Sequence, residues 1–354
     1  MRSMSKAFLL IPGARLPKGN PECEALLARE DIRDTLSRVT PAGVSAVTQC
    51  LDLGPYRRAP HRIWLWKVLT RERSYPREAP WAWLAMGARE QTPELWALSA
   101  LRLDAAGRVQ GVVSLGDEDF LTLTMALSPV LARAGFRLQM WDNHWFVTRP
   151  TNWDLVSTPA DVLVGKSIDC AMVGEAAPKT KALLEALLSA AAQHGAAVKG
   201  IGTFWLWGGG RHCRFNPPTQ IRAVASNEPI ILGWANASGI LNTFLSAEDV
   251  GWSAQTAPGD VIATISTLYE PWLREDWQRW AALLPQTIEA IERYRAAALA
   301  RPDTDLALVL FGETGSATLM GQAESGGLLS RLLKRKAPAA DLTAWIDHYD
   351  APPT

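Results

Sequence analysis

The segment Thr203–Arg211, TFWLWGGGR, constrains the fold of this chain more than any other. Its aromatic and β-branched residues are typical of a buried strand, so we expect a strand over residues 201–207. The glycines at 208–210 then predict a tight turn, because glycine adopts positive φ and lets another backbone or a ligand approach closely. We therefore expect a functional surface where this strand ends.

The chemistry of the turn predicts an anionic ligand. Successive exposed backbone amides can form a concave nest that binds anions, and Arg211 adds a positive charge beside it. Trp205 and Trp207 lie two residues apart, so on a strand they point to one face and support the turn. The residues that we assign to this ligand site are Trp205, Trp207, Gly208, Gly209, Gly210 and Arg211. The alternative is a turn that only reverses the chain.

A second set of polar residues follows the strand expected at Ile221–Ala225. Strand ends in an open α/β sheet commonly contact ligands, so Asn227 and Glu228 are further ligand-binding candidates. The alternative is that Ser226, Asn227 and Glu228 cap the helix that begins at Pro229.

Known phosphate, catalytic and metal motifs do not occur in the sequence. No Lys-Ser/Thr pair follows the glycines, the GxGxxG spacing is absent, and neither GxSxG nor HExxH is present. The five histidines share no ligand-like spacing and the four cysteines form no CxxC pair; these residues are His61, His144, His194, His212 and His348, and Cys23, Cys50, Cys170 and Cys213. We therefore expect no metal, no cofactor and no catalytic residue, and the cysteine usage fits a reducing cytoplasm.

Strand and helix patterns alternate along the chain, which predicts an α/β fold with a mixed or mostly parallel sheet flanked by helices. We expect further strands at 7–11, 95–103, 109–115, 136–140, 144–148, 261–267, 306–311 and 316–320. Helices are expected near 23–38, from Asp117, from Pro178 to Gly195, at 230–238 and over 273–300. Pro129 and Pro285 should end or interrupt the helices that contain them.

The amino-acid composition limits the classes of partner that we expect the chain to bind. Lysine and arginine number 36, as do aspartate and glutamate, so no net field attracts nucleic acid. The apolar run Ala7–Ile11 is too short for a membrane span.

We divide the chain into an N-terminal α/β region over 1–115, a core region over 116–325, and a basic tail over 326–354. The tail could contact an anionic surface, although such a segment is more often a solvated face.

Tryptophan is unusually frequent, with 16 residues. Large aromatic rings most often fill cores. Tryptophan is also enriched in binding hot spots, so an exposed cluster of Trp64, Trp66, Trp81 and Trp83 would indicate a protein-interaction module.

The sequence 204–210, together with 223–233 (AVASNEPIILG) and 237–239 (ASG), resembles the bacterial RpfE-type regulatory protein family, whose members are described as cofactor-independent phosphoglycerate mutase-like. The resemblance implies part of the alkaline-phosphatase-like, phosphoglycerate mutase fold. Enzymes of that fold have a metal-binding aspartate after the first strand and histidines near the C-terminus. Here the corresponding segments are Pro12–Arg15 and Gly312–Gly315, which contain neither, so the catalytic residues do not carry over.

These observations lead to three hypotheses. The first is a cytoplasmic, non-catalytic regulatory protein that binds a small anionic or phosphorylated metabolite at Gly208–Arg211. The second is an active metal-dependent enzyme, either a phosphoglycerate mutase, which is an isomerase, or a phosphoryl-transfer enzyme; it requires at least three Asp, Glu or His side chains in one pocket. The third is a protein-interaction module that uses exposed tryptophans.

Overall fold

The computed structural model describes residues 5–40, 46–50, 53–72, 74–88, 93–169, 171–195, 200–212, 220–245, 259–301, 303–321 and 342–347. The chain forms two compact units, each assembled from separate stretches of sequence. The first unit contains Met1–Leu53, Ala59–Arg71 and Asn216–Thr354, and the second contains Gly54–Arg58 and Glu72–Phe215. Cys170, Cys213, His348 and most of the basic tail lie outside the described residues.

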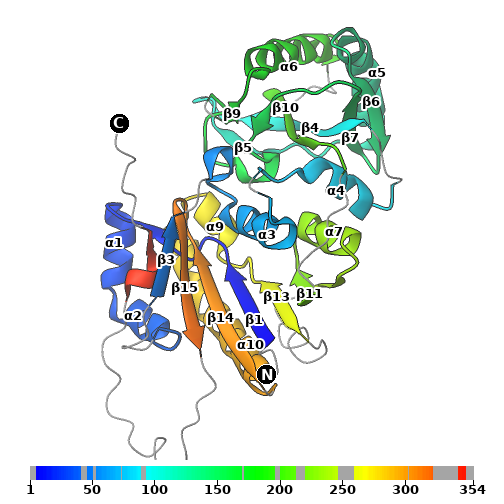
Figure 1. Ribbon diagram of the computed structural model, residues 1–354. Helices are drawn as coiled ribbons and strands as arrows, with labels where there is room; N and C mark the ends of the chain where they lie inside the picture. The colour runs from blue at the N-terminus through cyan, green and yellow to red at the C-terminus, as the bar shows by residue number, and fades with distance from the viewer. Residues whose placement is uncertain are drawn as a thin grey trace, which may run out of the picture. The chain divides into compact units, whose positions relative to one another are not determined.

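The first unit is built on a seven-stranded sheet in the order β12-β11-β13-β1-β14-β15-β3 (Figure 1). The strands are β1 Ser5–Ile11, β3 Ala46–Cys50, β11 Ile221–Ser226, β12 Leu241–Phe244, β13 Asp260–Thr264, β14 Thr304–Phe311 and β15 Gly315–Gly321. The first five strands of that order are parallel, and β15 and β3 are antiparallel to their neighbours. Leu9 of β1 is paired with Ala263 and Leu308 and is fully buried, which explains the uninterrupted apolar sequence of this central strand.

Six helices of the described residues belong to the first unit. They are α1 Pro21–Ala28, α2 Glu30–Ser37, α3 Pro60–Thr70, α7 Pro229–Ala237, α9 Tyr269–Leu273 and α10 Trp277–Leu299. The Asn20 side chain accepts the amide hydrogens of Glu22 and Cys23 and so begins α1. Helix α10 lies along one face of the sheet (Figure 1).

The expected interruptions at Pro285 and Pro129 do not occur. Helix α10 continues through Pro285, and α5 of the second unit, Asp117–Arg133, continues through Pro129. Both prolines lie on the exposed side of their helices. The opposite side of each helix is buried, and this burial outweighs the one backbone hydrogen bond that each proline removes.

The second unit contains an antiparallel sheet in the order β10-β4-β7-β6, with β5 also paired to β4. Its strands are β4 Glu94–Leu103, β5 Val109–Val112, β6 Arg137–Trp141, β7 His144–Arg149 and β10 Thr203–Gly210. Figure 1 shows α5 and α6, Ala177–Ala192, together on one side of this sheet, and α4, Glu78–Ala85, on the other. The strands predicted at 136–140 and 144–148 are confirmed as β6 and β7, and they pair as a hairpin.

Short elements complete both units. In the second unit β8 Val156–Ser157 pairs with β9 Met172–Val173. The 3-10 turn η1 Gly54–Tyr56 packs against β8, and the 3-10 turn η2 Ala160–Val162 packs against β5. In the first unit β2 Leu16–Pro17 pairs with β16 Ile346–Asp347, which follows the turn η4 Leu342–Trp345.

The tryptophans mostly fill the two cores. Trp66, Trp81 and Trp83 are buried, and Trp64 is half-buried with its ring against Phe8 and Phe311. These four residues therefore form no exposed cluster, and the hypothesis of a tryptophan-based interaction module loses the observation that it needed. No helix in the described part of the chain is long and apolar enough to cross a membrane.

Candidate functional site

The glycines 208–210 extend a strand instead of forming the predicted turn. Strand β10 runs to Gly210, and its pairing with β4 shifts between Trp207, opposite Ala97, and Gly210, opposite Leu95. The strand end between Trp207 and Gly210 therefore contains a β-bulge, which a run of three glycines permits. Gly208 has φ +66°, a left-handed conformation that favours glycine.

Close packing explains why residues 208–210 are glycines. A Cβ on Gly209 would meet the Trp96 ring at 2.1 Å. A Cβ on Gly208 would lie 3.0 Å from the backbone nitrogen of Ala79, and one on Gly210 would lie 2.6 Å from Arg77 Cδ. The glycine run therefore lets Trp96, the start of α4 and Arg77 approach the strand from different directions.

The two tryptophans assigned to the site differ in environment. Trp205 is fully buried, and its indole N–H donates to the Thr158 carbonyl at 2.8 Å. Trp207 is half-buried and donates to the Ser99 hydroxyl at 3.0 Å. Neither ring lines the cavity described next, so both support the strand.

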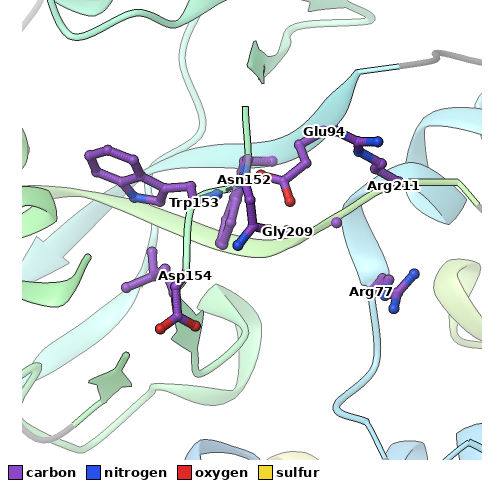
Figure 2. A pocket seen from close by; sticks show the side chains of 10 residues that line it. Arg77, Glu94, Asn152, Trp153, Asp154, Gly209 and Arg211 are labelled. Carbon is purple, nitrogen blue, oxygen red and sulfur yellow. Dashed lines mark hydrogen bonds between the residues drawn. The ribbon is translucent and has the colours of Figure 1, made fainter. Parts of the chain in front are cut away.

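A cavity of about 320 Å³ opens beside the glycine segment (Figure 2). Gly209, Gly210 and Arg211 form one wall of it. The remaining lining residues are Arg77, Glu94, Trp96, Asn152, Trp153, Asp154 and Leu155. The wall at 209–211 was predicted from the sequence, but these seven residues were not, because they come from three separate stretches of the second unit with no common motif.

Two arginines give one side of the cavity a positive charge. Figure 2 shows Arg77 and Arg211 on one side and Asp154 on the other, with Asn152 between them. Arg211 donates to the Pro150 carbonyl at 3.3 Å, and Arg77 lies 4.0 Å from the Glu72 carboxylate. Neither guanidinium has a carboxylate within hydrogen-bonding distance among the described residues, so both can bind an added anion.

Glu94 is the buried acid of this cavity. Its carboxylate accepts the backbone N–H of Trp153 at 2.9 Å. Burial raises the pKa of Glu94, while the Trp153 hydrogen bond and the charges of Arg211 and Arg149 oppose the rise. The protonated, neutral form of Glu94 therefore persists to higher pH than that of an exposed glutamate. The charge of Glu94 matters for binding, because an ionised Glu94 would repel a negatively charged ligand in the cavity.

A second cavity of about 240 Å³ shares part of this wall. Gly209, Leu155 and Arg77 line both cavities. The second cavity is otherwise lined by Tyr56, Ser74, Tyr75, Pro76, Val156, Ser157 and Gly208. Gly209, Leu155 and Arg77 thus lie at the boundary of the two cavities.

The other two predicted site residues, Asn227 and Glu228, belong to the first unit. Glu228 occupies the N-cap position of α7, but its side chain makes no capping bond, and its own N–H donates to the Ser226 hydroxyl. The carboxylate of Glu228 instead binds two residues of α3: Nε2 of His61 and Nε of Arg62 each lie 2.8 Å from one of its oxygens. Asn227 is exposed. The structure thus divides the predicted ligand residues between two units.

Glu228, His61 and Arg62 form a cluster in which the ionised form of Glu228 is strongly stabilised. Burial alone would raise the pKa of Glu228, but the charges and hydrogen bonds of His61 and Arg62 outweigh burial and lower the pKa to about 2. A carboxylate accepts hydrogen bonds only, so His61 carries its proton on Nε2. The cluster fastens α3 to the carboxyl end of β11.

Metal-ligating side chains do not gather in the part of the chain that is described: no group of three or more His, Cys, Asp or Glu residues could hold an ion there. The metal-dependent mutase hypothesis therefore gains no observation from these residues. The two segments in which that hypothesis expects metal ligands, Pro12–Arg15 and Gly312–Gly315, do lie together, since they follow the paired strands β1 and β14.

Together the fold and site define a mixed α/β protein with a largely parallel central sheet flanked by helices, as the sequence predicted. No protein-family model and no curated protein matches the sequence. Among solved structures, the chain is similar to the cofactor-independent phosphoglycerate mutase from Thermoplasma acidophilum, with 12% identity, 90% of each chain covered and a TM-score of 0.47. It is similar at 11% identity to a Pyrococcus horikoshii protein, over 90% of this chain and 87% of that one, again with a TM-score of 0.47. The resemblance to RpfE-type proteins stays a prediction.

Proposed function

We propose that this protein is a non-catalytic regulatory protein that binds a small anionic metabolite, a carboxylate or a phosphate ester, in the cavity beside Gly209–Arg211. The observation that carries the proposal is the pair Arg77 and Arg211 on one side of a cavity of about 320 Å³, neither engaged with a close carboxylate among the described residues. Guanidinium groups bind carboxylates and phosphates through paired N–H donors.

The opposite side of the cavity narrows the ligand class. Asn152 can donate and accept hydrogen bonds, and Asp154 as a carboxylate accepts them. A ligand that places its anionic group at Arg77 and Arg211 would therefore offer hydroxyl groups to Asn152 and Asp154. This favours hydroxylated acids and their phosphate esters, the class to which phosphoglycerates belong, over simple fatty acids.

The regulatory part of the proposal rests on the sequence, in which the glycine segment occurs without a recognisable nucleophile motif or metal motif. A cytoplasmic location belongs to the same proposal. The ligand would act by stabilising the second unit, whose sheet ends at the cavity wall.

A thermal-shift titration of the full-length protein tests binding. Glycerol 3-phosphate and 3-phosphoglycerate should raise the melting temperature in a saturable way, and glycerol should not, because a ligand that binds only the native state stabilises it. Arg211→Ala and Arg77→Ala should each weaken binding by about tenfold, and Arg133→Ala, an exposed arginine on α5, should leave it unchanged.

Two results would overturn the proposal. One is the absence of a shift with any anion, or an equal shift in the Arg77→Ala/Arg211→Ala double variant. The other is conversion of 3-phosphoglycerate to 2-phosphoglycerate with added Mn²⁺ or Mg²⁺ by the wild type but not by Gly209→Val. That result would establish the isomerase instead.

A further inference from the structure

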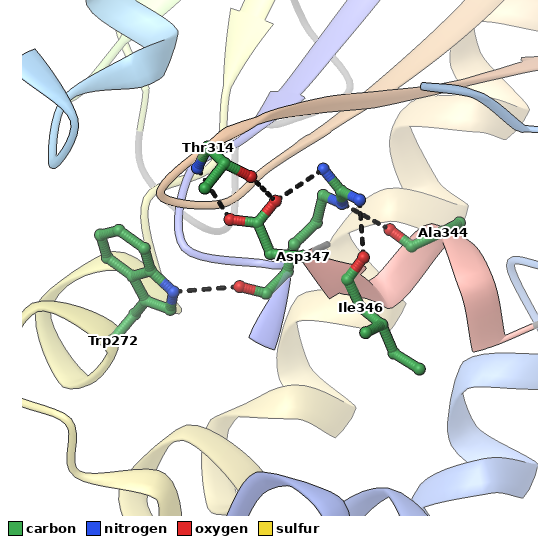
Figure 3. A network of polar contacts seen from close by, with 6 residues as sticks. Trp272, Thr314, Ala344, Ile346 and Asp347 are labelled. Carbon is green, nitrogen blue, oxygen red and sulfur yellow. Dashed lines mark hydrogen bonds and ion pairs between the residues drawn. The ribbon is translucent and has the colours of Figure 1, made fainter. Parts of the chain in front are cut away.

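A buried carboxylate in the first unit is held by donors from two distant loops (Figure 3). Asp347 Oδ1 lies 2.9 Å from Arg15 Nη1 and 2.6 Å from the Thr314 hydroxyl, and Asp347 Oδ2 accepts the Thr314 backbone N–H at 2.8 Å. Arg15 follows β1, and Thr314 follows β14. We call Arg15 and Thr314 the anion cradle.

The cradle has the chemistry of an anion-binding site. A guanidinium, a hydroxyl and a backbone amide converge on one carboxylate, and such groups bind free carboxylates and phosphates in the same way. Gly312 keeps the backbone close: a Cβ there would meet Asp347 Oδ2 at 2.5 Å. The cradle also lies at the carboxyl ends of neighbouring parallel strands, where open α/β sheets bind ligands.

The occupant of the cradle comes from the C-terminal end of the described chain. The segment Leu342–Asp347 passes over the cradle, and the Ala344 and Ile346 carbonyls accept hydrogen bonds from Arg15 Nε and Nη2. Arg15 and Asp347 are both 3% exposed. The segment therefore covers the cradle and fills it with its own carboxylate.

The attachment of this segment is uneven. Trp345 is fully buried, with its indole N–H 3.2 Å from the Thr40 hydroxyl, and anchors the turn η4. The two residues beyond it form β16, which pairs with only Leu16 and Pro17 of β2, and the Asp347 carbonyl accepts the Lys18 N–H. Trp345 therefore anchors the turn η4 through contacts that do not involve the Asp347 carboxylate, so losing the Asp347 contacts would not by itself remove η4 from the core.

We infer that the Arg15–Thr314 cradle is an anion-binding site that the chain's own Asp347 occupies, and that a free carboxylate or phosphate competes with Asp347 and releases β16. This site is separate from the cavity of the proposed function, because all of its residues belong to the first unit. A tethered group acts at an effective concentration on the order of millimolar, so the free anion must reach at least that concentration.

Hydrogen exchange of the full-length protein, followed by mass spectrometry, tests the displacement. The protein is exchanged in sodium chloride, sodium acetate or sodium phosphate at equal ionic strength. Acetate or phosphate should accelerate exchange about fivefold or more in peptides that contain Lys18 or residues 346–347, and leave β14 unchanged. Faster exchange with acetate but not with phosphate identifies a carboxylate site. Faster exchange with phosphate but not with acetate identifies a phosphate site.

Variants test the cradle itself. In full-length Asp347→Ala, acetate or phosphate should raise the melting temperature above its value in chloride, because the free anion replaces the missing carboxylate. The Arg15→Met/Asp347→Ala double variant should lose this response, and Asp34→Ala, an exposed carboxylate on α2, should behave as wild type.

Each negative result is decisive. Unchanged exchange in wild type together with stabilised Asp347→Ala means that the cradle binds anions but does not release Asp347, which overturns the competition. Unchanged exchange without stabilisation means that Asp347 and Arg15 form a structural ion pair only. If Asp347→Ala does not fold, the exchange of wild type alone decides between these outcomes and the inference.

Discussion

The indole ring of Trp96 lies against the backbone of Gly209, where a Cβ would meet ring atoms at 2.1 and 2.2 Å. The ring belongs to β4 and is 2% exposed, so it is fixed by the core and cannot turn away. Both residues also line the candidate cavity. Packing of one tryptophan on one glycine therefore links the stability of the second unit to the shape of the ligand site.

Gly209→Ala should destabilise the second unit by about 3 kcal/mol, because overpacking a rigid aromatic contact forces the strand or the ring to move. Chemical denaturation with circular dichroism measures the loss. Gly116→Ala is the control, because a Cβ at Gly116 meets nothing within 4 Å; Gly116 is the N-cap of α5, where replacing glycine by alanine costs about 1 kcal/mol or less. A Gly209→Ala protein as stable as Gly116→Ala would show that the ring and the strand are not in close contact.

Sequence patterns predicted many helices and strands, because these elements are determined by residues that are close together in the sequence. The apolar run at 7–11, the proline and leucine repeat from Pro178, and the glycine between 306–311 and 316–320 correspond to β1, α6 and the β14–β15 hairpin. In each case neighbouring residues determine the structure through burial period or turn chemistry.

Other features depend on partners that are distant in sequence. The helices α3 and α4 were not predicted, because their buried tryptophans pack against segments that are distant in sequence. The strand ending at Gly210 read as a turn, since only its pairing with β4 shows a bulge. Lining residues such as Arg77 and Asn152 have no local signature at all.

Trp205 and Trp207 should differ in their contribution to stability, although they occupy one face of β10. Trp205→Phe removes a buried donor and leaves the Thr158 carbonyl without it, which costs about 2 kcal/mol. Trp207→Phe removes a half-buried bond to Ser99 and should cost about 1 kcal/mol or less. Urea unfolding of both variants checks the order; equal losses would contradict it.

Acid should weaken the first unit through Glu228. The pKa of Glu228 is about 2 in the folded chain against an ordinary 4.5, so its contribution is complete above pH 4.5 and is lost as the pH falls toward 2. The difference corresponds to about 3 kcal/mol. Denaturation curves between pH 3 and pH 6 measure the part of this contribution that is lost above pH 3.

The control for that pH dependence is Glu228→Gln, which keeps the shape of the side chain. The variant should be less stable than wild type at pH 6, because Arg62 and His61 lose their anionic partner. Its stability should change less between pH 6 and pH 3. A slope as steep as that of wild type would assign the acid sensitivity to other carboxylates.

Glu94 should make anion binding at the proposed site stronger at low pH. Burial already raises the pKa of Glu94, and a bound anion nearby would raise it further, since both charges are negative. By linkage, binding then takes up a proton, and affinity increases as the pH falls from 7 toward the pKa of Glu94. Calorimetric titration of glycerol 3-phosphate at pH 7 and pH 5, in buffers with different ionisation enthalpies, measures both the affinity and the proton uptake.

Glu94→Gln separates this effect from the titration of the ligand. The amide oxygen of glutamine can still accept the Trp153 N–H, but the side chain carries no charge at any pH. The variant should bind more tightly than wild type at pH 7, without proton uptake by the protein. Weaker binding by Glu94→Gln at pH 7 would mean that the carboxylate orients Arg211, whose charge already acts on it, and that its repulsion of the ligand is the smaller effect.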